Sequence, residues 1–495
     1  MKKKVLLFFP SYRSIEAAPP LALLALAPIA EQRGLTVDIV DSTIEPRYRE
    51  RILHQLDDAV CVGISIVTGP MIYEAIELAR AVKSARPDVP VILGGWHPST
   101  LAEQTLKAPY VDVVVRGQGE VTFGEILDRL LAGATLEGVH GCSYRTADGR
   151  IVHNPSRQTV NISGLPPKAY HLVDLEPYAS LCGRRWIYYT SSHGCPYDCS
   201  FCSNASIYGR AWNALPADQV VDEIVDLVRR FRLDLVDIID DNFLVDRQRG
   251  IDIAAGFVKS GLRFDWCIQT TANFLLRSSD DDVRLLRQSG LSRVFIGAES
   301  GSDDVLRSVN KVRFQGTRIL HQVAEKCHRA GITCTFSLIF ALPGETEGDR
   351  RQTLAMIREI KSQYPSTEFH SNIYTPYPGA PNFRHAVDMG LREPESLEQW
   401  AEFYPKFQRL PWIDDKTHRQ IQRIREYIRI AYGATAVRRR STMREAAHKV
   451  LAPIARARLN RDRYALPVEL WALQSFSRLK NRLGFHNVRT HVMQS

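Results

Sequence analysis

The eight residues Cys195-Pro196-Tyr197-Asp198-Cys199-Ser200-Phe201-Cys202 place three cysteines in a CxxxCxxC spacing. Thiolates are soft ligands that hold iron–sulfur clusters. Three cysteines this close in sequence can hold three irons of a four-iron cluster, which leaves the fourth iron without an obvious protein ligand. Such an open iron can bind the amine and carboxylate of a methionine-like ligand and pass it an electron. We therefore predict a 4Fe-4S cluster on Cys195, Cys199 and Cys202. The alternatives are a zinc site, which usually needs a fourth Cys or His, and three thiols in the core.

The cysteine motif follows the first strand of an alternating series of strands and helices. Helices are expected between the strands, for example over residues 217–231 and 317–330. Because six such units fall short of a closed eightfold barrel, residues 185–384 are predicted to form an open, partial (β/α)6 barrel. The six expected strands span residues 187–190, 235–239, 264–270, 293–296, 333–340 and 368–374.

Polar and glycine-rich segments follow several of these strands, at the end of a barrel where ligands bind. The segments are Asp240-Asp241-Asn242-Phe243, Gly297-Ala298-Glu299-Ser300-Gly301, Leu342-Pro343-Gly344-Glu345-Thr346 and Tyr377-Pro378-Gly379-Ala380-Pro381. Taken singly, Asp240 and Asp241 could cap a helix, and Glu299 could be a surface charge. Their order at successive strand ends favours one shared binding site.

Short apolar strands also alternate with helices in residues 1–137, which predicts an α/β, doubly wound, Rossmann-like domain. Ligands of such sheets bind at the carboxyl ends of the strands. Glycines there let the backbone approach a bulky ligand, and Ser and Thr can hydrogen-bond to it. The candidate binding residues at these ends are Ser65, Thr68, Gly94, Gly95, His97, Gly117, Gly119 and Glu120.

Residues 138–184 are predicted to form a hairpin, with its turn at Asp148-Gly149, and then a linker around Leu165-Pro166-Pro167. Residues 385–495 are expected to be helical. Residues 434–495 hold 13 Lys and Arg against 3 Asp and Glu, whereas the rest of the chain holds 51 basic and 52 acidic residues. We expect this basic region to form a helical cap over the barrel, with contact to an anionic membrane surface as the second option. Nucleic acid is disfavoured, because no RNA-binding module accompanies the charge.

The composition excludes several classes of protein. With 495 residues, 44% hydrophobic and 24% charged, the chain has the composition of a soluble protein of two or three domains. It lacks the run of about 18 apolar residues that a membrane span needs, and the start of the sequence does not resemble a signal peptide. We expect a cytoplasmic protein, with association to a membrane surface as the second option. The cysteine number, nine, is odd and six are scattered, which argues against a secreted disulfide framework.

The cysteine motif, with an aromatic residue before its third cysteine, resembles that of the radical SAM superfamily, and the resemblance covers residues 186–383. It implies that S-adenosylmethionine (SAM) contacts Asp240, Asp241 and Asn242 through its amine. It also implies contacts of Glu299 and Ser300 near the ribose and carboxylate of SAM, and of Pro343 and Gly344 near the adenine. Ala341 stands where that family more often has Gly.

The N-terminal domain resembles the cobalamin-binding domain of the B12-dependent branch of this superfamily. The DxHxxG motif that supplies a cobalt ligand in many B12 proteins is absent, as is usual in that branch, so no cobalt ligand is predicted. The resemblance implies that His97 contacts the edge of the corrin or packs in its loop. The alternative is a flavodoxin-like domain that binds nothing.

The resemblance implies a function. The cluster would reduce SAM to methionine and a 5′-deoxyadenosyl radical, and cobalamin would carry a methyl group to the substrate radical. The first expectation is a C-methyltransferase that acts on an unactivated carbon of a small or lipid-like natural-product intermediate, supplied with electrons by a flavodoxin or ferredoxin. The second is an oxidative cyclase or ring-rearranging enzyme, like the anaerobic porphyrin cyclases. The third is a cofactor-binding protein without turnover.

Overall fold

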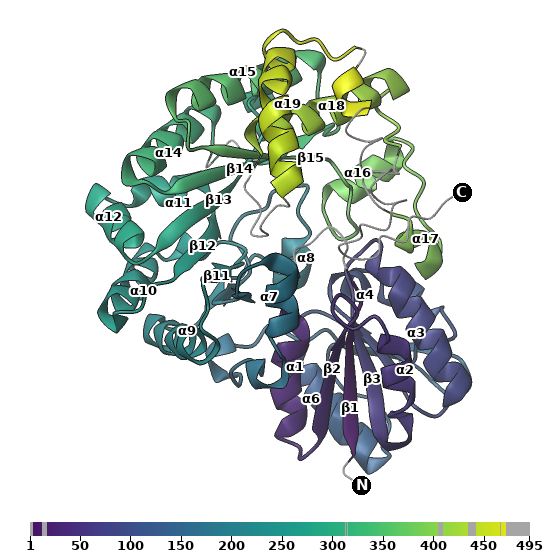
Figure 1. Cartoon of the computed structure of the whole chain (residues 1–495). Coiled ribbons are helices and arrows are strands. Elements are labelled where there is room, and N and C mark those ends of the chain that lie inside the picture. The colour runs from purple at the N-terminus through teal and green to yellow at the C-terminus, as the bar shows by residue number, and fades with distance from the viewer. Residues whose placement is uncertain are drawn as a thin grey trace.

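A computed structural model describes residues 3–11, 17–311, 313, 315–403, 409–433, 442–465 and 467–471, without the side chains of 442–449. The described chain forms two largely parallel sheets, each covered by helices, with further helices at the C-terminal side (Figure 1). The predicted fold class is confirmed in both parts.

The first sheet has the strand order β2-β1-β3-β4-β5-β6-β7. Alternate residues of β1 point to opposite faces: Val5 and Leu7 pack in the core with α1 and α6, whereas Leu6 and Phe8 pack in the core with α3. The strands of this sheet are β1 (Lys4–Phe9), β2 (Thr36–Asp41), β3 (Ala59–Ser65), β4 (Val91–Gly94), β5 (Val113–Val115), β6 (Cys142–Arg145) and β7 (Ile151–His153). Its helices are α1 (Leu21–Glu31), α2 (Tyr48–Leu53), α3 (Met71–Ala85), α4 (Trp96–Thr100), α5 (Ala102–Leu106) and α6 (Glu120–Ala132).

The predicted hairpin is present, but it belongs to this first sheet. Strand β6 pairs antiparallel with β5, and β7 pairs antiparallel with β6, so the hairpin extends the N-terminal sheet by two strands. The linker then passes through α7 (Glu176–Cys182) to the barrel.

The second sheet has six parallel strands in the order β15-β14-β13-β12-β11-β8 and is not closed into a ring, as predicted. Its strands are β8 (Trp186–Tyr189), β11 (Leu235–Ile238), β12 (Asp265–Thr270), β13 (Leu291–Glu299), β14 (Thr333–Phe340) and β15 (Glu368–Ile373). The helices that follow them are α9 (Ala217–Phe231), α10 (Arg247–Ser260), α11 (Ala272–Arg277), α12 (Asp280–Gln288), α13 (Asp303–Ser308), α14 (Thr317–Ala330) and α15 (Glu347–Gln363). The loop after β8 also holds β9 (Ser192–His193), α8 (Asn204–Tyr208) and β10 (Asn213–Ala214).

The two faces of the barrel strands differ in burial. Val294 and Ile296 of β13 and Phe336 of β14 are fully buried in the core that contains α14 residues. The alternate residues, such as Phe295 and Ser337, are only partly buried. Since alternate residues of a strand face opposite sides, the half-buried set faces the inside of the barrel.

The C-terminal region touches both domains. Its described helices are α16 (Asn382–Asp388), α17 (Leu397–Ala401), α18 (Asp415–Tyr432) and α19 (Thr442–Asn460). Helix α17 packs on α3, where Glu398 pairs with Arg80 at 2.7 Å and accepts a hydrogen bond from Tyr110. Helix α18 packs on β15, and α19 packs on α18, so a helical cap over the barrel edge is present. Residues 434–441 and 472–495 of the basic region lie outside the described residues.

Ala341, at the end of β14, has the left-handed backbone conformation that favours glycine, with φ of 64°. Its N–H donates to Glu345 and its carbonyl accepts from Trp412, so both neighbours hold this conformation in place. We expect Ala341→Gly to raise the free energy of unfolding by up to about 1 kcal/mol. The substitution removes the strain of the alanine Cβ in the left-handed conformation, and this gain outweighs the extra conformational entropy that a glycine loses on folding. Ala298→Gly in β13 is the control and should destabilise the protein. Urea unfolding of both variants measures this, and a loss of stability for Ala341→Gly would contradict it.

Candidate functional site

The three motif cysteines lie in one loop between β9 and α8, and each is partly buried. The Sγ of Cys202 accepts a hydrogen bond from the Asn204 N–H at 3.4 Å, and the Asn242 side-chain amide lies 3.8 Å from the Sγ of Cys195. The loop is tied to the rest of the barrel at Ser200, which donates from its N–H to Val309 and accepts from the N–H of Asn382. N–H···S hydrogen bonds of this kind tune iron–sulfur clusters.

Burial raises the pKa of all three thiols, that of Cys199 to about 12, and the Lys311 ammonium opposes this for Cys195 and Cys199. A metal must therefore displace the protons, which couples binding to pH. Within the described residues, no three Cys, His, Asp or Glu side chains are arranged to hold a single metal ion. Because a four-iron cluster takes each thiolate on a different iron, its ligands need not meet at one point.

Asp240 and Asp241 follow β11 but have different surroundings. Asp240 is fully buried and accepts hydrogen bonds from the N–H and Oγ of Ser191 at 2.6 Å and from the Oγ of Ser192 at 2.7 Å. Its carboxylate therefore holds the loop that leads into the cysteine motif, and it does not face a ligand site as the resemblance implied. Asp241 accepts from the N–H of Gly194 at 2.8 Å and lines the large cavity described below.

Asn242 is fully buried beside the cluster loop. Its Oδ1 accepts a hydrogen bond from Thr270 at 2.9 Å, which fixes the orientation of the amide, so its Nδ2 points toward the Sγ of Cys195. The structure thus places Asn242 against a cluster cysteine.

Glu299 and Lys311 form a buried ion pair, with the Nζ of Lys311 at 2.6 Å from Oε1 of Glu299. The pair lies over Gly297, where a Cβ would come within 2.3 Å of the Glu299 carboxylate. A side chain at position 297 would therefore push aside the ends of both side chains of this pair. Ser300 is also buried and lies 3.1 Å from the Oγ1 of Thr353 on α15, so it joins the strand end to that helix.

Pro343 and Gly344 form an accessible turn after β14, and Gly344 has φ of 82°. Glu345 lies behind the turn: it accepts from the Ala341 N–H at 2.6 Å, and burial raises its pKa to about 7. The buried Glu345 carboxylate therefore stabilises the turn, while Pro343 and Gly344 stay accessible to a ligand.

A cavity of about 410 Å³ lies between the first sheet and the barrel. Its size is that of a typical ligand pocket. On one side it is walled by apolar residues between the sheet and α1 and α6. On the other side it is walled by His193, from the loop that precedes the cysteine motif, and by Asp241, from the segment after β11. Six of the eight residues predicted for the N-terminal domain line it: Ser65, Gly94, Gly95, Gly117, Gly119 and Glu120.

The other two predicted residues, Thr68 and His97, do not line this cavity. Their side chains bond to each other, with Oγ1 and Nδ1 3.0 Å apart, and His97 packs edge-on against Trp400 at 5.6 Å. His97 is 1% exposed, and burial lowers its pKa to about 3. It therefore packs from α4 against α17 as a neutral residue, and the prediction of a ligand contact is corrected.

Lys168, in the linker, lines the cavity although the sequence did not single it out. Its Nζ donates to the Thr190 carbonyl at 3.1 Å and lies 5.0 Å from the centre of the Tyr189 ring. Burial lowers its pKa, and Glu223 of the barrel and Glu120 of the first domain oppose this shift. A cation thus lies between carboxylates of two domains. In the sequence Lys168 is a single lysine after two prolines, and this pattern does not indicate a binding site.

The arrangement fits the predicted cofactors. Three thiols on one loop, two of them beside N–H groups, suit a cluster. The cavity has an apolar wall and a rim of three carboxylates and one lysine, which suits a broad ring with hydrogen-bonding amides around its edge. At Gly95 a Cβ would lie 2.4 Å from the carbonyl of Ile66, so glycine is required at this rim.

Two family models match the chain: the B12 binding domain over residues 16–127 and the radical SAM superfamily over residues 189–357. The chain therefore joins a B12-binding domain to a radical SAM domain, the combination found in cobalamin-dependent radical SAM enzymes. Its cofactors are a 4Fe-4S cluster, SAM and cobalamin.

Several characterised and uncharacterised proteins are similar to this chain along most of their length. An uncharacterized methyltransferase of Pyrococcus horikoshii is 28% identical over 78% of this chain and 84% of its own length. The anaerobic magnesium-protoporphyrin IX monomethyl ester cyclase of Rubrivivax gelatinosus is 27% identical (78% and 70%). The hopanoid C-3 methylase of Methylococcus capsulatus is 26% identical (73% and 67%).

Solved structures share the fold. The cobalamin-dependent SAM radical enzyme OxsB, with aqua-cobalamin and SAM bound, matches with a TM-score of 0.75 at 16% identity, over 97% of this chain and 75% of its own. The radical SAM methyltransferase TsrM of Kitasatospora setae, with cobalamin and a [4Fe-4S] cluster bound, matches with a TM-score of 0.67 at 19% identity, over 80% and 76%.

Proposed function

We propose that this enzyme methylates an unactivated carbon of a small or lipid-like natural-product intermediate. The observation that carries the proposal is the single cavity that reaches from the strand ends of the B12-binding domain to Asp241 and His193 beside the cysteine loop. When bound, the cluster supplies an electron to SAM, and cobalamin supplies the methyl group. The cavity brings the two sites next to each other, and the bound cofactors would shield the space between them from water.

The chain's own residues support this chemistry by position. The side-chain amide of Asn242 points toward the Sγ of Cys195, and the Asn204 N–H donates to the Sγ of Cys202. The ammonium group of Lys311 adds a positive charge near Cys195 and Cys199. Each of these stabilises the thiolate form. Asp241 presents an accessible carboxylate next to the loop and is the acidic residue we assign to the SAM amine.

Substrate recognition is assigned to the inner face of the barrel. Gln269, Phe295, Ser337 and Asn372 lie there at half-buried positions, and the Asn372 amide donates to the Ser337 hydroxyl at 3.4 Å. One aromatic ring among amide and hydroxyl groups suits a largely apolar skeleton with a few hydrogen-bonding substituents. The hopanoid methylase among the relatives supports a lipid-like substrate, and the cyclase supports the alternative of ring formation without methyl transfer.

The co-products distinguish these two functions. We would reconstitute the cluster and hydroxocobalamin anaerobically, add a strong reductant and SAM with a deuterated methyl group, and quantify the nucleoside products. Methylation predicts S-adenosylhomocysteine in at least the amount of bound corrin, together with 5′-deoxyadenosine. Formation of 5′-deoxyadenosine without S-adenosylhomocysteine would favour the cyclase. Absence of both would leave a cofactor-binding protein.

Lys168 is expected to contribute to cobalamin binding. Lys168→Met keeps the length of the side chain but leaves Glu120 and Glu223 without the cation between them, so the affinity for hydroxocobalamin should fall about tenfold. Lys168→Arg, which keeps the charge, is the control. Absorption titration of the two variants with hydroxocobalamin measures the effect. Equal affinities for Lys168→Met and the native protein would show that the lysine has only a structural role.

A further inference from the structure

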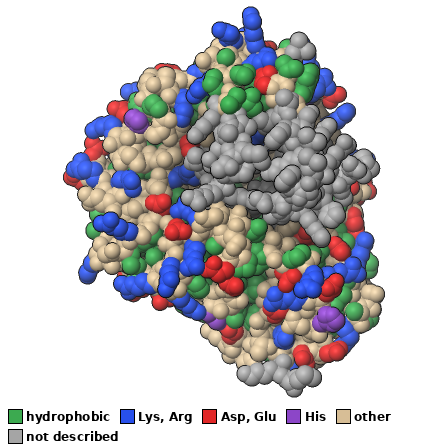
Figure 2. All heavy atoms as spheres, viewed as in Figure 1, with side chains coloured by type: hydrophobic (Ala, Val, Ile, Leu, Met, Phe, Trp, Pro, Cys, Tyr) green, Lys and Arg blue, Asp and Glu red, His purple; other side chains and the backbone are tan. Residues whose placement is uncertain are grey.

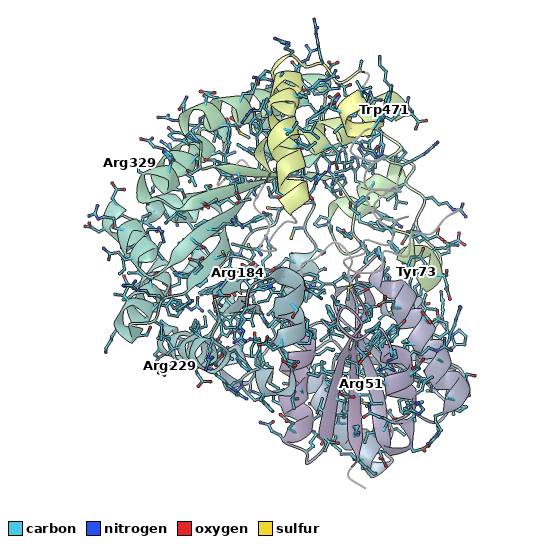
Figure 3. All side chains as sticks on the ribbon, viewed as in Figure 1. Arg51, Tyr73, Arg184, Arg229, Arg329 and Trp471 are labelled. Atoms are coloured by element: carbon cyan, nitrogen blue, oxygen red, sulfur yellow. The ribbon has the colours of Figure 1, made fainter. Side chains whose placement is uncertain are left out.

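Most of the large hydrophobic side chains that are exposed among the described residues lie in one short stretch of the sequence. Among the described residues five large hydrophobic side chains are exposed, and four of them lie in a stretch of 22 residues: Val450 (70%), Ile454 (42%), Val468 (60%) and Trp471 (48%). Figure 3 labels Trp471 at the end of the described chain, beside α18, and Figure 2 shows hydrophobic side chains with Lys and Arg at the top of the molecule. We call these four residues the C-terminal apolar patch.

The exposed residues of α19 do not pack this helix on the protein, because α19 buries a different apolar face. Ala455 and Leu459 are 1% exposed and pack in the core with α18. Val450, Ile454 and Ala457 recur at a spacing of four and three residues, which puts them on one side of the helix, and all three are exposed.

The segment after α19 is arranged in the same way. Glu469 accepts a hydrogen bond from Tyr427 of α18 at 2.6 Å and pairs with Arg458, which fixes the segment, and Leu470 is buried beside it. Val468 and Trp471 therefore stay outside on a backbone that is held in position.

Positive charge surrounds the patch. Arg456, Arg461 and Arg463 are exposed, and none of them forms an ion pair with another described residue. The acidic residues of the stretch, Asp462 and Glu469, already pair with Arg358 and Arg458. Residues 434–495 as a whole carry 13 basic and 3 acidic residues.

We propose that the C-terminal apolar patch docks the enzyme on the surface of an anionic lipid bilayer. Exposed aliphatic side chains and a tryptophan suit the boundary between headgroups and acyl chains, and arginines that form no ion pair with a described residue suit anionic headgroups. None of the described helices is long and apolar enough to cross a bilayer, so the contact is peripheral. A lipid-like substrate would reach the enzyme from this surface; that clause rests on the proposed function, whereas the docking does not.

Vesicle sedimentation of the purified full-length protein tests the docking. One set of vesicles is phosphatidylcholine alone, and the other is equal parts phosphatidylcholine and phosphatidylglycerol. We expect at least about tenfold tighter binding to the anionic set, and weakening as salt is raised. Val468→Ser with Trp471→Ser should lower that affinity about tenfold, because both side chains are exposed and their loss does not disturb the core.

The matched control is Val258→Ser on α10, which removes the fifth exposed hydrophobic side chain and should bind like the native protein. Equal binding to both vesicle sets, or a double variant that binds as well as the native protein, would overturn the proposal. So would a native dimer that the double variant makes monomeric without any vesicle binding, because the patch would then join two copies. The assay needs no turnover, so its failure would leave the proposed methylation standing.

Discussion

Cys199→Ala is expected to abolish reductive cleavage of SAM while the protein stays folded. Cys199 is one of three thiols on a single loop, and without it only two thiols of the motif remain to hold a four-iron cluster. The iron content and the absorption of the cluster should fall to background, and 5′-deoxyadenosine should not form. The loop itself should persist, because Ser200 rather than Cys199 anchors it to Val309 and Asn382.

Cys61→Ala is the matched control for this variant. Cys61 is a fully buried thiol of β3 in the first sheet, and its loss should leave the iron content unchanged. Iron analysis, absorption spectra and product assays of the two variants give the comparison. SAM cleavage by Cys199→Ala would disprove the assignment of the cluster to this motif.

Asp240→Asn is expected to lower both stability and iron content, whereas Asp241→Asn should lower neither by much. The Asp240 carboxylate takes three hydrogen bonds from Ser191 and Ser192 and lies near the buried Arg249 guanidinium. Replacing the carboxylate by an amide puts an N–H against a hydroxyl and leaves the guanidinium without its counter-charge. We expect this to lower the free energy of unfolding by about 2–4 kcal/mol. The loop that carries Cys195 would then shift, so cluster assembly should fall several-fold.

Asp241 provides the contrast, because it is accessible from the cavity and burial raises its pKa. The Oδ1 of an asparagine can still accept the hydrogen bond from the Gly194 N–H, so the fold and the iron content of Asp241→Asn should persist, while its affinity for SAM should fall. Urea unfolding, iron analysis and SAM titration of both variants measure this. Equal loss of iron in the two variants would contradict the separate roles.

The sequence alone predicted the order of the two domains, the open six-stranded barrel and the position of the cysteine loop, because strand and helix periodicity and motif spacing are local properties. It could not separate Asp240 from Asp241. Successive residues after a strand face different sides, and only the fold shows that Ser191 and Ser192 lie against the first of them.

His97 and Lys168 also show what the sequence alone could not predict: the first was expected at the ligand and does not line the cavity, whereas the second was not singled out and does. His97 was predicted near the ligand because it follows a strand end, but Trp400, about 300 residues later in the chain, covers it. Lys168 lies in a proline-rich linker that resembled a plain connection, and it reaches the cavity because the linker crosses between the two domains. Contacts between segments this far apart have no local signal.

The most direct test that this protein uses a cluster and cobalamin together is to combine both cofactors in one sample. The full-length protein is reconstituted anaerobically with iron, sulfide and hydroxocobalamin, desalted, and treated with SAM and a strong reductant. We expect about one corrin and one four-iron cluster per chain after desalting, and 5′-deoxyadenosine among the products. A protein that assembles the cluster but retains no corrin would contradict the role of the cavity between the domains, and a protein with both cofactors that leaves SAM intact would contradict the enzyme assignment itself.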